Sequence, residues 1–186
     1  MSSSSSGRGG AGGGRPTLGV ALIGSTGSIG RQAVDVLAGH PEAFRVVALA
    51  AGSDGPLLAE QARRLRPTAV ALAADPALTG LDLPPGTDRI GGRDALVELA
   101  TRDDVDLVVI GTGGIVSLRP VLAALEAGKV VATANKETLV AGGHRSTSNR
   151  LLAAAFVTTV LVDTYGTYLS GQREDAAKLL ALAPLI

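Results

Sequence analysis

The sequence LGVALIGSTGSIGRQAVDV, residues 18–36, reads as a buried strand, a glycine-rich turn and the first turns of a helix. Residues 20–23 are a short apolar run, typical of a strand that is covered on both faces. The turn GSTGSIG, residues 24–30, follows directly. Apolar residues then recur at helical spacing, namely Ile29, Ala33, Val36 and Leu37. A glycine-rich turn between a strand and a helix is the context that indicates nucleotide binding.

The chemistry of a pyrophosphate explains why nucleotides bind to glycine-rich turns of this kind. Glycines let the backbone turn tightly and approach the phosphates, and the free N–H groups at a helix start point at the negative charge. The spacing is G-x-x-G-x-x-G, with Thr26 where the commoner motif has its middle glycine. A plain structural turn is the competing interpretation, but the position between strand and helix favours nucleotide binding.

Composition narrows the class of protein. The 186 residues are 46% hydrophobic but only 2% aromatic, so the core must consist of Ala, Val, Leu and Ile. The net charge of +0 provides no basic field for nucleic acid. Without cysteine there is no disulfide, thiolate metal site or thiol nucleophile. No apolar run is long enough to cross a membrane, and His40 and His144 lie in loop-like contexts without an expected catalytic role.

Further strands alternate with helices along the chain. We expect strands at 44–50, 68–73, 106–110 and 130–134, helices through 58–65, 93–101 and 121–125, and little regular structure in 75–92. This order predicts an α/β fold, a Rossmann-like doubly wound, mostly parallel sheet with helices on both faces. Four residues that follow strands should line one crevice at the carboxyl edge of the sheet: Gly24, Gly52, Gly111 and Asn135.

The loop after the second strand should hold the adenosine ribose of a dinucleotide. Gly52 and Ser53 are small, which leaves room for a 2′-phosphate and offers a hydroxyl to donate to it. Asp54 leaves two interpretations open. It contacts the ribose, as in sites that prefer NAD, or it lies in the turn ahead of Pro56 at a helix start. The residues favour NADP only slightly.

A second motif, Ala134-Asn135-Lys136-Glu137-Thr138, follows the fifth strand. The lysine has the chemistry to hold an anionic substrate or polarise a carbonyl, and the asparagine to hydrogen-bond an amide or ribose. The competing interpretation is that Asn135 and Thr138 are turn or cap residues and that Lys136 and Glu137 are solvated surface residues.

Together, GSTGSIG and ANKETLV resemble the 1-deoxy-D-xylulose 5-phosphate reductoisomerase family over residues 18–143. The resemblance implies NADPH, a divalent metal (Mg²⁺ or Mn²⁺), a small sugar phosphate as substrate, and a homodimer. The implied reaction rearranges the carbon skeleton and reduces it to 2-C-methyl-D-erythritol 4-phosphate. Homoserine dehydrogenases, which carry a similar ANK triplet, are a distant alternative.

The resemblance also implies roles for individual residues. The NADPH phosphates would lie against Thr26, Gly27, Ser28 and Ile29, and the 2′-phosphate against Gly52, Ser53 and Asp54. Asn135 and Glu137 would contact NADPH, and Lys136 the substrate. Family members often have a basic residue and an asparagine where this chain has Ser53 and Asp54. The resemblance therefore supports a 2′-phosphate role less strongly for these two residues than for the others.

Past Gly143 the resemblance decays. The family continues with a strand and D-S-E-H, which supplies two metal-binding carboxylates. Here the matching residues are Asp163, Thr164 and Tyr165, and a neutral phenol does not replace a carboxylate for a hard cation. Asp163 is therefore a weak metal candidate, and an ordinary strand-end role is favoured for it.

These observations predict three segments: a Ser/Gly-rich disordered tail at 1–17, an NADPH-binding domain at 18–144, and a partial or diverged start of a catalytic domain at 145–186. We expect a cytoplasmic protein, with a plastid location as the alternative. Two functions stand: membership of the reductoisomerase family, and a noncatalytic NADPH-binding module that lacks the metal and substrate site.

Overall fold

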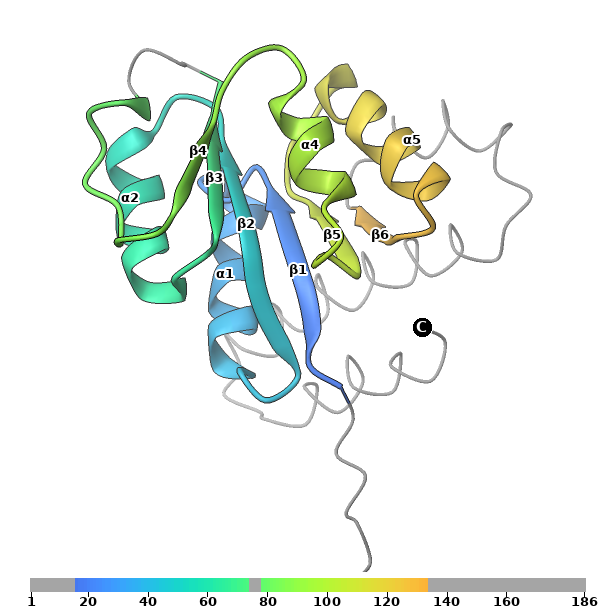
Figure 1. Cartoon of the computed structure of the whole chain (residues 1–186), viewed down its shortest axis with the longest axis horizontal. Coiled ribbons are helices and arrows are strands. Elements are labelled where there is room, and N and C mark those ends of the chain that lie inside the picture. The colour runs from blue at the N-terminus through green and yellow to red at the C-terminus, as the bar shows by residue number, and fades with distance from the viewer. Residues whose placement is uncertain (1–15, 74–77, 134–186) are drawn as a thin grey trace, which may run out of the picture.

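The core of the protein is one six-stranded sheet, seen in a computed structural model that describes residues 16–73 and 78–133. All strand pairs are parallel, in the order β4-β3-β2-β1-β5-β6. The strands are β1 Leu18–Ile23, β2 Phe44–Ala51, β3 Ala69–Leu72, β4 Asp88–Ile90, β5 Leu107–Ile110 and β6 Val130–Thr133. The predicted doubly wound parallel sheet is thereby confirmed (Figure 1).

Helices cover both faces of this sheet. They are α1 Ser28–Gly39, α2 Gly55–Leu65, α4 Ala95–Thr101, the 3₁₀ turn η1 Ile115–Ser117, and α5 Leu118–Glu126. Side chains of α1 and α2 pack on one face, together with Val20 and Leu22 of β1. Side chains of α4 and α5 pack on the other face, with Ala21 and Ile23 of the same strand. Neighbouring residues of β1 thus face opposite helical layers, which explains why its sequence is continuously apolar.

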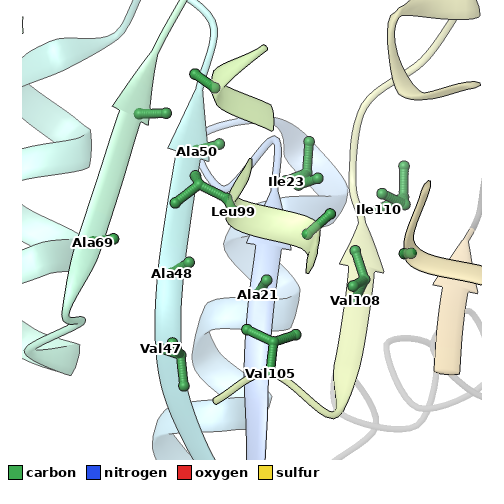
Figure 2. Close-up of a cluster of buried hydrophobic side chains, with 14 of the residues drawn as sticks. Ala21, Ile23, Val47, Ala48, Ala50, Ala69, Leu99, Val105, Val108 and Ile110 are labelled. Atoms are coloured by element: carbon green, nitrogen blue, oxygen red, sulfur yellow. The ribbon is translucent and has the colours of Figure 1, made fainter. Parts of the chain in front are cut away.

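The second of these layers is built from small aliphatic side chains. Figure 2 shows Leu99 of α4 in front of the sheet, in one cluster with Ala48, Ala21 and Val108 of the strands behind it. Leu99 and Val108 are almost completely buried. This packing agrees with the expectation of an aliphatic core with few aromatic residues.

One element was missed by the sequence prediction. Residues 75–92 were expected to have little regular structure, yet Asp88–Ile90 forms β4 beside β3. The strand is short, lies at the edge of the sheet and is mostly exposed, so it carries no apolar pattern. Its position is fixed by long-range bonds, because Thr87 Oγ1 donates to the carbonyl of Pro67 and the Asp88 amide to that of Thr68.

Within the ranges the structure covers, we find no helix with the length and apolarity that a membrane crossing requires.

Candidate nucleotide site

The carboxyl ends of β1, β2 and β5 meet at one edge of the sheet. β1 pairs with β2 on one side and with β5 on the other, so the direction of chain progression reverses beside β1. Gly24, Gly52 and Gly111 follow these three strands. Open α/β sheets bind ligands at such a reversal. The structure brings these three glycines to the predicted edge, while Asn135 lies outside the described residues.

Three glycines at this edge are closely enclosed by the fold itself. Gly24 has φ +87°, and a Cβ on it would overlap Thr112. A Cβ on Gly30 would overlap the carbonyl oxygen of Gly24, and one on Gly111 would lie 3.0 Å from the Gly30 nitrogen. Backbone–backbone contact between the turn, the start of α1 and the end of β5 leaves no room for a side chain.

Two other glycines are not enclosed in this way. A Cβ on Gly27 would meet only the carbonyl oxygens of Gly111 and Gly24, at 3.4 and 3.5 Å, which are ordinary contacts. A Cβ on Gly52 would meet nothing within 4 Å. Gly27 has φ −70°, a conformation open to any residue. Packing within the described residues therefore gives no reason for glycine at these two exposed positions, and the same holds for the exposed Gly39 and Gly80. Gly27 and Gly52 differ from those two in their position, directly at the carboxyl ends of the strands where a ligand would approach the backbone.

The N-terminus of α1 lies beside Gly27 and is open to a ligand. Gly27 is the N-cap residue, so no side chain accepts from the helix amides, and the first turn holds no acidic residue. The first bond back to the cap runs from the Arg31 amide to the Gly27 carbonyl, at 2.9 Å. The amides of Ser28 and Ile29 have no acceptor within the described part of the chain. Such amides, aligned with the helix dipole, favour an anion.

The turn itself is fixed by bonds from neighbouring elements. The amides of Gly24 and Ser25 both donate to the Ala50 carbonyl at the end of β2, at 2.8 and 2.9 Å. On the other side, Nε2 of Gln61 in α2 donates to the Ser25 carbonyl at 2.9 Å. Gln61 is a buried polar side chain and was missed by the sequence analysis. Its signal was a glutamine three residues after Leu58, on the apolar face of the helix.

Several polar atoms beside the turn are buried without a protein partner. They are Ser25 Oγ, Gln61 Oε1 and Thr112 Oγ1, counted over the residues that the structure describes. Buried polar atoms normally have hydrogen-bond partners. The surroundings of the turn are therefore more polar than the sheet below them.

The loop after β2 is exposed, and the structure shows one of the two roles considered for Asp54. The Asp54 carboxylate accepts from the Leu57 amide at 3.0 Å and caps α2, with Pro56 in the first turn. The helix-start interpretation is thus the one the structure shows. Gly52 and Ser53 remain exposed beside it.

Some predicted site residues fall outside the described residues: Asn135, Lys136, Glu137 and Asp163. The same holds for His144. His40 places its Nδ1 3.0 Å from the Val36 carbonyl at the end of α1, a structural contact far along the helix from the turn.

Arg102 and Asp104, just before β5, have pKa values shifted from their ordinary values, and they lie at the amino ends of the strands, away from the glycine turn. The hydrogen bond from Arg102 Nε, at 2.9 Å, lowers the pKa of Asp104 below its ordinary value. The same bond raises the pKa of Arg102. Because this pair lies at the amino ends of the strands, we assign it to stability and not to the candidate site.

Comparisons with known proteins agree with this geometry. A family model for 1-deoxy-D-xylulose 5-phosphate reductoisomerase matches residues 20–143. The Nostoc sp. reductoisomerase is 46% identical over 129 residues, which are 67% of this chain and 32% of that protein. The Thermomicrobium roseum one is 50% identical over 126 residues, 68% of this chain and 32% of that protein. The chloroplastic enzyme of Oryza sativa is 45% identical over 131 residues, 67% of this chain and 27% of that protein.

Solved structures show the same likeness. The Zymomonas mobilis reductoisomerase in complex with NADPH matches with a TM-score of 0.63 and 31% identity, over 69% of this chain and 35% of that one. A reductoisomerase in complex with NADPH, fosmidomycin and magnesium matches with a TM-score of 0.59 and 29% identity, over 76% of this chain and 35% of that one. The chain spans about a third of the length of the curated relatives it matches.

Proposed function

The chain belongs to the 1-deoxy-D-xylulose 5-phosphate reductoisomerase family, and from that premise we propose that residues 18–144 form its NADPH-binding domain. The observation that carries the proposal is the division among the glycines. Gly24, Gly30 and Gly111 are closely packed, whereas Gly27 and Gly52 are glycines at exposed positions where the fold would accept a side chain. A cofactor that approaches the backbone closely at both positions accounts for this difference.

The residues present fit such a cofactor. The pyrophosphate would lie against Thr26, Gly27, Ser28 and Ile29, where α1 begins without a side-chain cap. The 2′-phosphate would lie beside Gly52, Ser53 and Asp54, with the Ser53 hydroxyl as donor. One oxygen of the Asp54 carboxylate, Oδ1, caps α2, and we propose that this side chain lies beside the phosphate.

We further propose that the whole enzyme rearranges 1-deoxy-D-xylulose 5-phosphate and reduces it to 2-C-methyl-D-erythritol 4-phosphate. NADPH, when bound, supplies the hydride for that reduction. The chain's part is to bind and orient the cofactor through the turn at 24–30, with Asn135 and Glu137 as further contacts and Lys136 toward the sugar phosphate. A homodimer and a cytoplasmic location, with a plastid as the alternative, complete this proposal.

The residues that stand where the family has its metal ligands do not fit a metal ion. Magnesium is present in a related solved structure, but Asp163 is one carboxylate with Tyr165 where the family has a glutamate. The described residues bring together no group of three or more His, Cys, Asp or Glu that could hold a metal ion. We therefore derive no step through a metal ion.

This mismatch favours a second candidate function, a noncatalytic NADPH-binding module. On this proposal residues 1–186 bind the cofactor and do not complete the reaction by themselves. The two candidates differ in one measurable respect, which is turnover of the pentulose phosphate.

Calorimetric titration of the full chain with NADPH, with NADH as control, tests the shared part of both proposals. We expect saturable binding that is tighter for NADPH. Absence of binding to either nucleotide would refute the NADPH domain. A second assay supplies 1-deoxy-D-xylulose 5-phosphate with NADPH and Mg²⁺ or Mn²⁺. Formation of methylerythritol phosphate would reject the noncatalytic module, and binding without turnover would support it.

A further inference from the structure

Gln61 is a buried polar residue that links the two halves of the candidate cofactor site. The residue is 5% exposed and lies in α2 among apolar neighbours that include Leu58 and Ala62. Nε2 donates to the Ser25 carbonyl at 2.9 Å. Because a carbonyl only accepts, the amide must present its NH₂ group here. Burial of a polar glutamine side chain costs free energy, and a hydrogen bond to a protein acceptor offsets that cost.

The Gln61 side chain bonds to the turn at Ser25, two residues after the end of β1. Ser25 follows Gly24 and precedes Thr26 and Gly27, the residues proposed to hold the pyrophosphate. Its amide is already bonded to the Ala50 carbonyl at the end of β2. The Gln61 side chain donates to the Ser25 carbonyl. The Ser25 backbone is therefore fixed by β2 and by α2 together.

These same two elements flank the loop proposed for the 2′-phosphate. β2 ends at Ala51 and α2 begins at Gly55, so Gly52, Ser53 and Asp54 are the connection between them. Asp54 lies seven positions before Gln61, two turns earlier on the same helix, and caps it. One helix thus carries the edge of the 2′-phosphate loop at its start and a bond to the pyrophosphate turn further along.

We propose that Gln61 is a positioning residue for NADPH, which sets the place of the pyrophosphate turn relative to the 2′-phosphate loop. This inference rests on the proposed NADPH site. A dinucleotide that bridges both segments needs them at a fixed separation, whereas a ligand that occupies the 2′-phosphate loop alone does not. Loss of the Gln61 bond leaves the Ser25 carbonyl buried without its donor and frees the turn.

The test compares Gln61→Met with Glu60→Met, a substitution at the exposed neighbouring position. Methionine is unbranched and of similar length, so it fills the space of the glutamine without a donor. Binding of NADPH and of 2′-AMP, which carries only the 2′-phosphate half, is measured by calorimetry, and thermal unfolding is recorded for each variant. We expect Gln61→Met to weaken NADPH binding about tenfold, and 2′-AMP binding by less than about twofold. Glu60→Met should change neither.

Equal weakening of both ligands by Gln61→Met would show a structural role for α2 and overturn the inference, as would unchanged NADPH binding. Gln61→Asn keeps the amide but is too short to reach Ser25, and is expected to reproduce the selective loss if the methionine variant does not fold. Failure of the unaltered chain to bind NADPH would instead refute the proposed function, so the two failures are distinguishable.

Discussion

The carbonyl oxygen of Gly24 occupies the space that a Cβ on Gly30 would need. Gly24 begins the turn after β1 with φ +87°, and Gly30 lies in the first turn of α1. The helix can begin this close to the turn because Gly30 lacks a side chain, whereas a Cβ on Gly24 would meet Thr112, beyond the end of β5. Gly111, at the end of β5, packs against the same two residues.

Gly30→Ala is therefore expected to destabilise the protein by about 2–3 kcal/mol, because the added methyl group overlaps backbone atoms that cannot yield cheaply. The matched control is Gly39→Ala at the other end of α1, where a Cβ would meet nothing within 4 Å. Its free energy of unfolding should change by less than about 1 kcal/mol. Urea titration followed by circular dichroism measures both, and equal stabilities would contradict the packing argument.

Gly27→Ala should separate ligand binding from folding. Its Cβ meets only ordinary contacts, so we expect stability to stay within about 1 kcal/mol of the unaltered chain. NADPH binding should weaken about tenfold or more, since the methyl group lies where the pyrophosphate approaches the backbone. Calorimetric titration and thermal unfolding of the same sample check this, and unimpaired NADPH binding would remove Gly27 from the site.

Two substitutions at Asp54 test its two effects. Asp54→Ala should lower the free energy of unfolding by about 1 kcal/mol, because the Leu57 amide loses its acceptor. Asp54→Asn keeps an acceptor and removes the charge beside the proposed 2′-phosphate. It should tighten NADPH binding a few-fold at low salt and leave NADH binding unchanged. Tighter binding of NADH as well would argue against a 2′-phosphate at this loop.

The Arg102–Asp104 pair predicts a dependence of stability on pH. Because the pKa of Asp104 is lowered in the folded state, the unfolded chain binds this proton first as the pH falls. The stabilisation is fully present above the unfolded pKa, near 4, and is lost as the pH falls through the lower, folded value. With 34% of the Asp104 side chain exposed, we expect less than about 1 kcal/mol.

Asp104→Asn should accordingly flatten the acid limb of the stability curve between about pH 5 and 2, while Asp103→Asn, at the exposed neighbouring position, should not. Urea unfolding at a series of pH values measures this. An identical acid limb in the Asp104 variant would show that the pair contributes nothing.

Much of the fold was predictable because its signals are local. The strands β1, β2, β3, β5 and β6 are apolar runs, and α1, α2 and α5 end at or shortly before a glycine or proline. β4 was not predictable, since Asp88 and Arg89 are exposed and their pairing with β3 is a long-range choice. Asp54 was ambiguous for a related reason: the sequence places it before Pro56, but only the geometry shows its carboxylate on the Leu57 amide.

The sequence by itself determined the strand–turn–helix order of residues 18–36, the parallel sheet and the family, because periodicity and motif spacing depend on neighbours along the chain. Only the tertiary structure decided which glycines are closely packed and which have room for a side chain among the described residues. Gly24, Gly27, Gly30, Gly52 and Gly111 are the same letter in the sequence. They differ in the atoms that a Cβ at each position would meet. Those atoms come largely from other elements of the fold, which meet only when the sheet has formed.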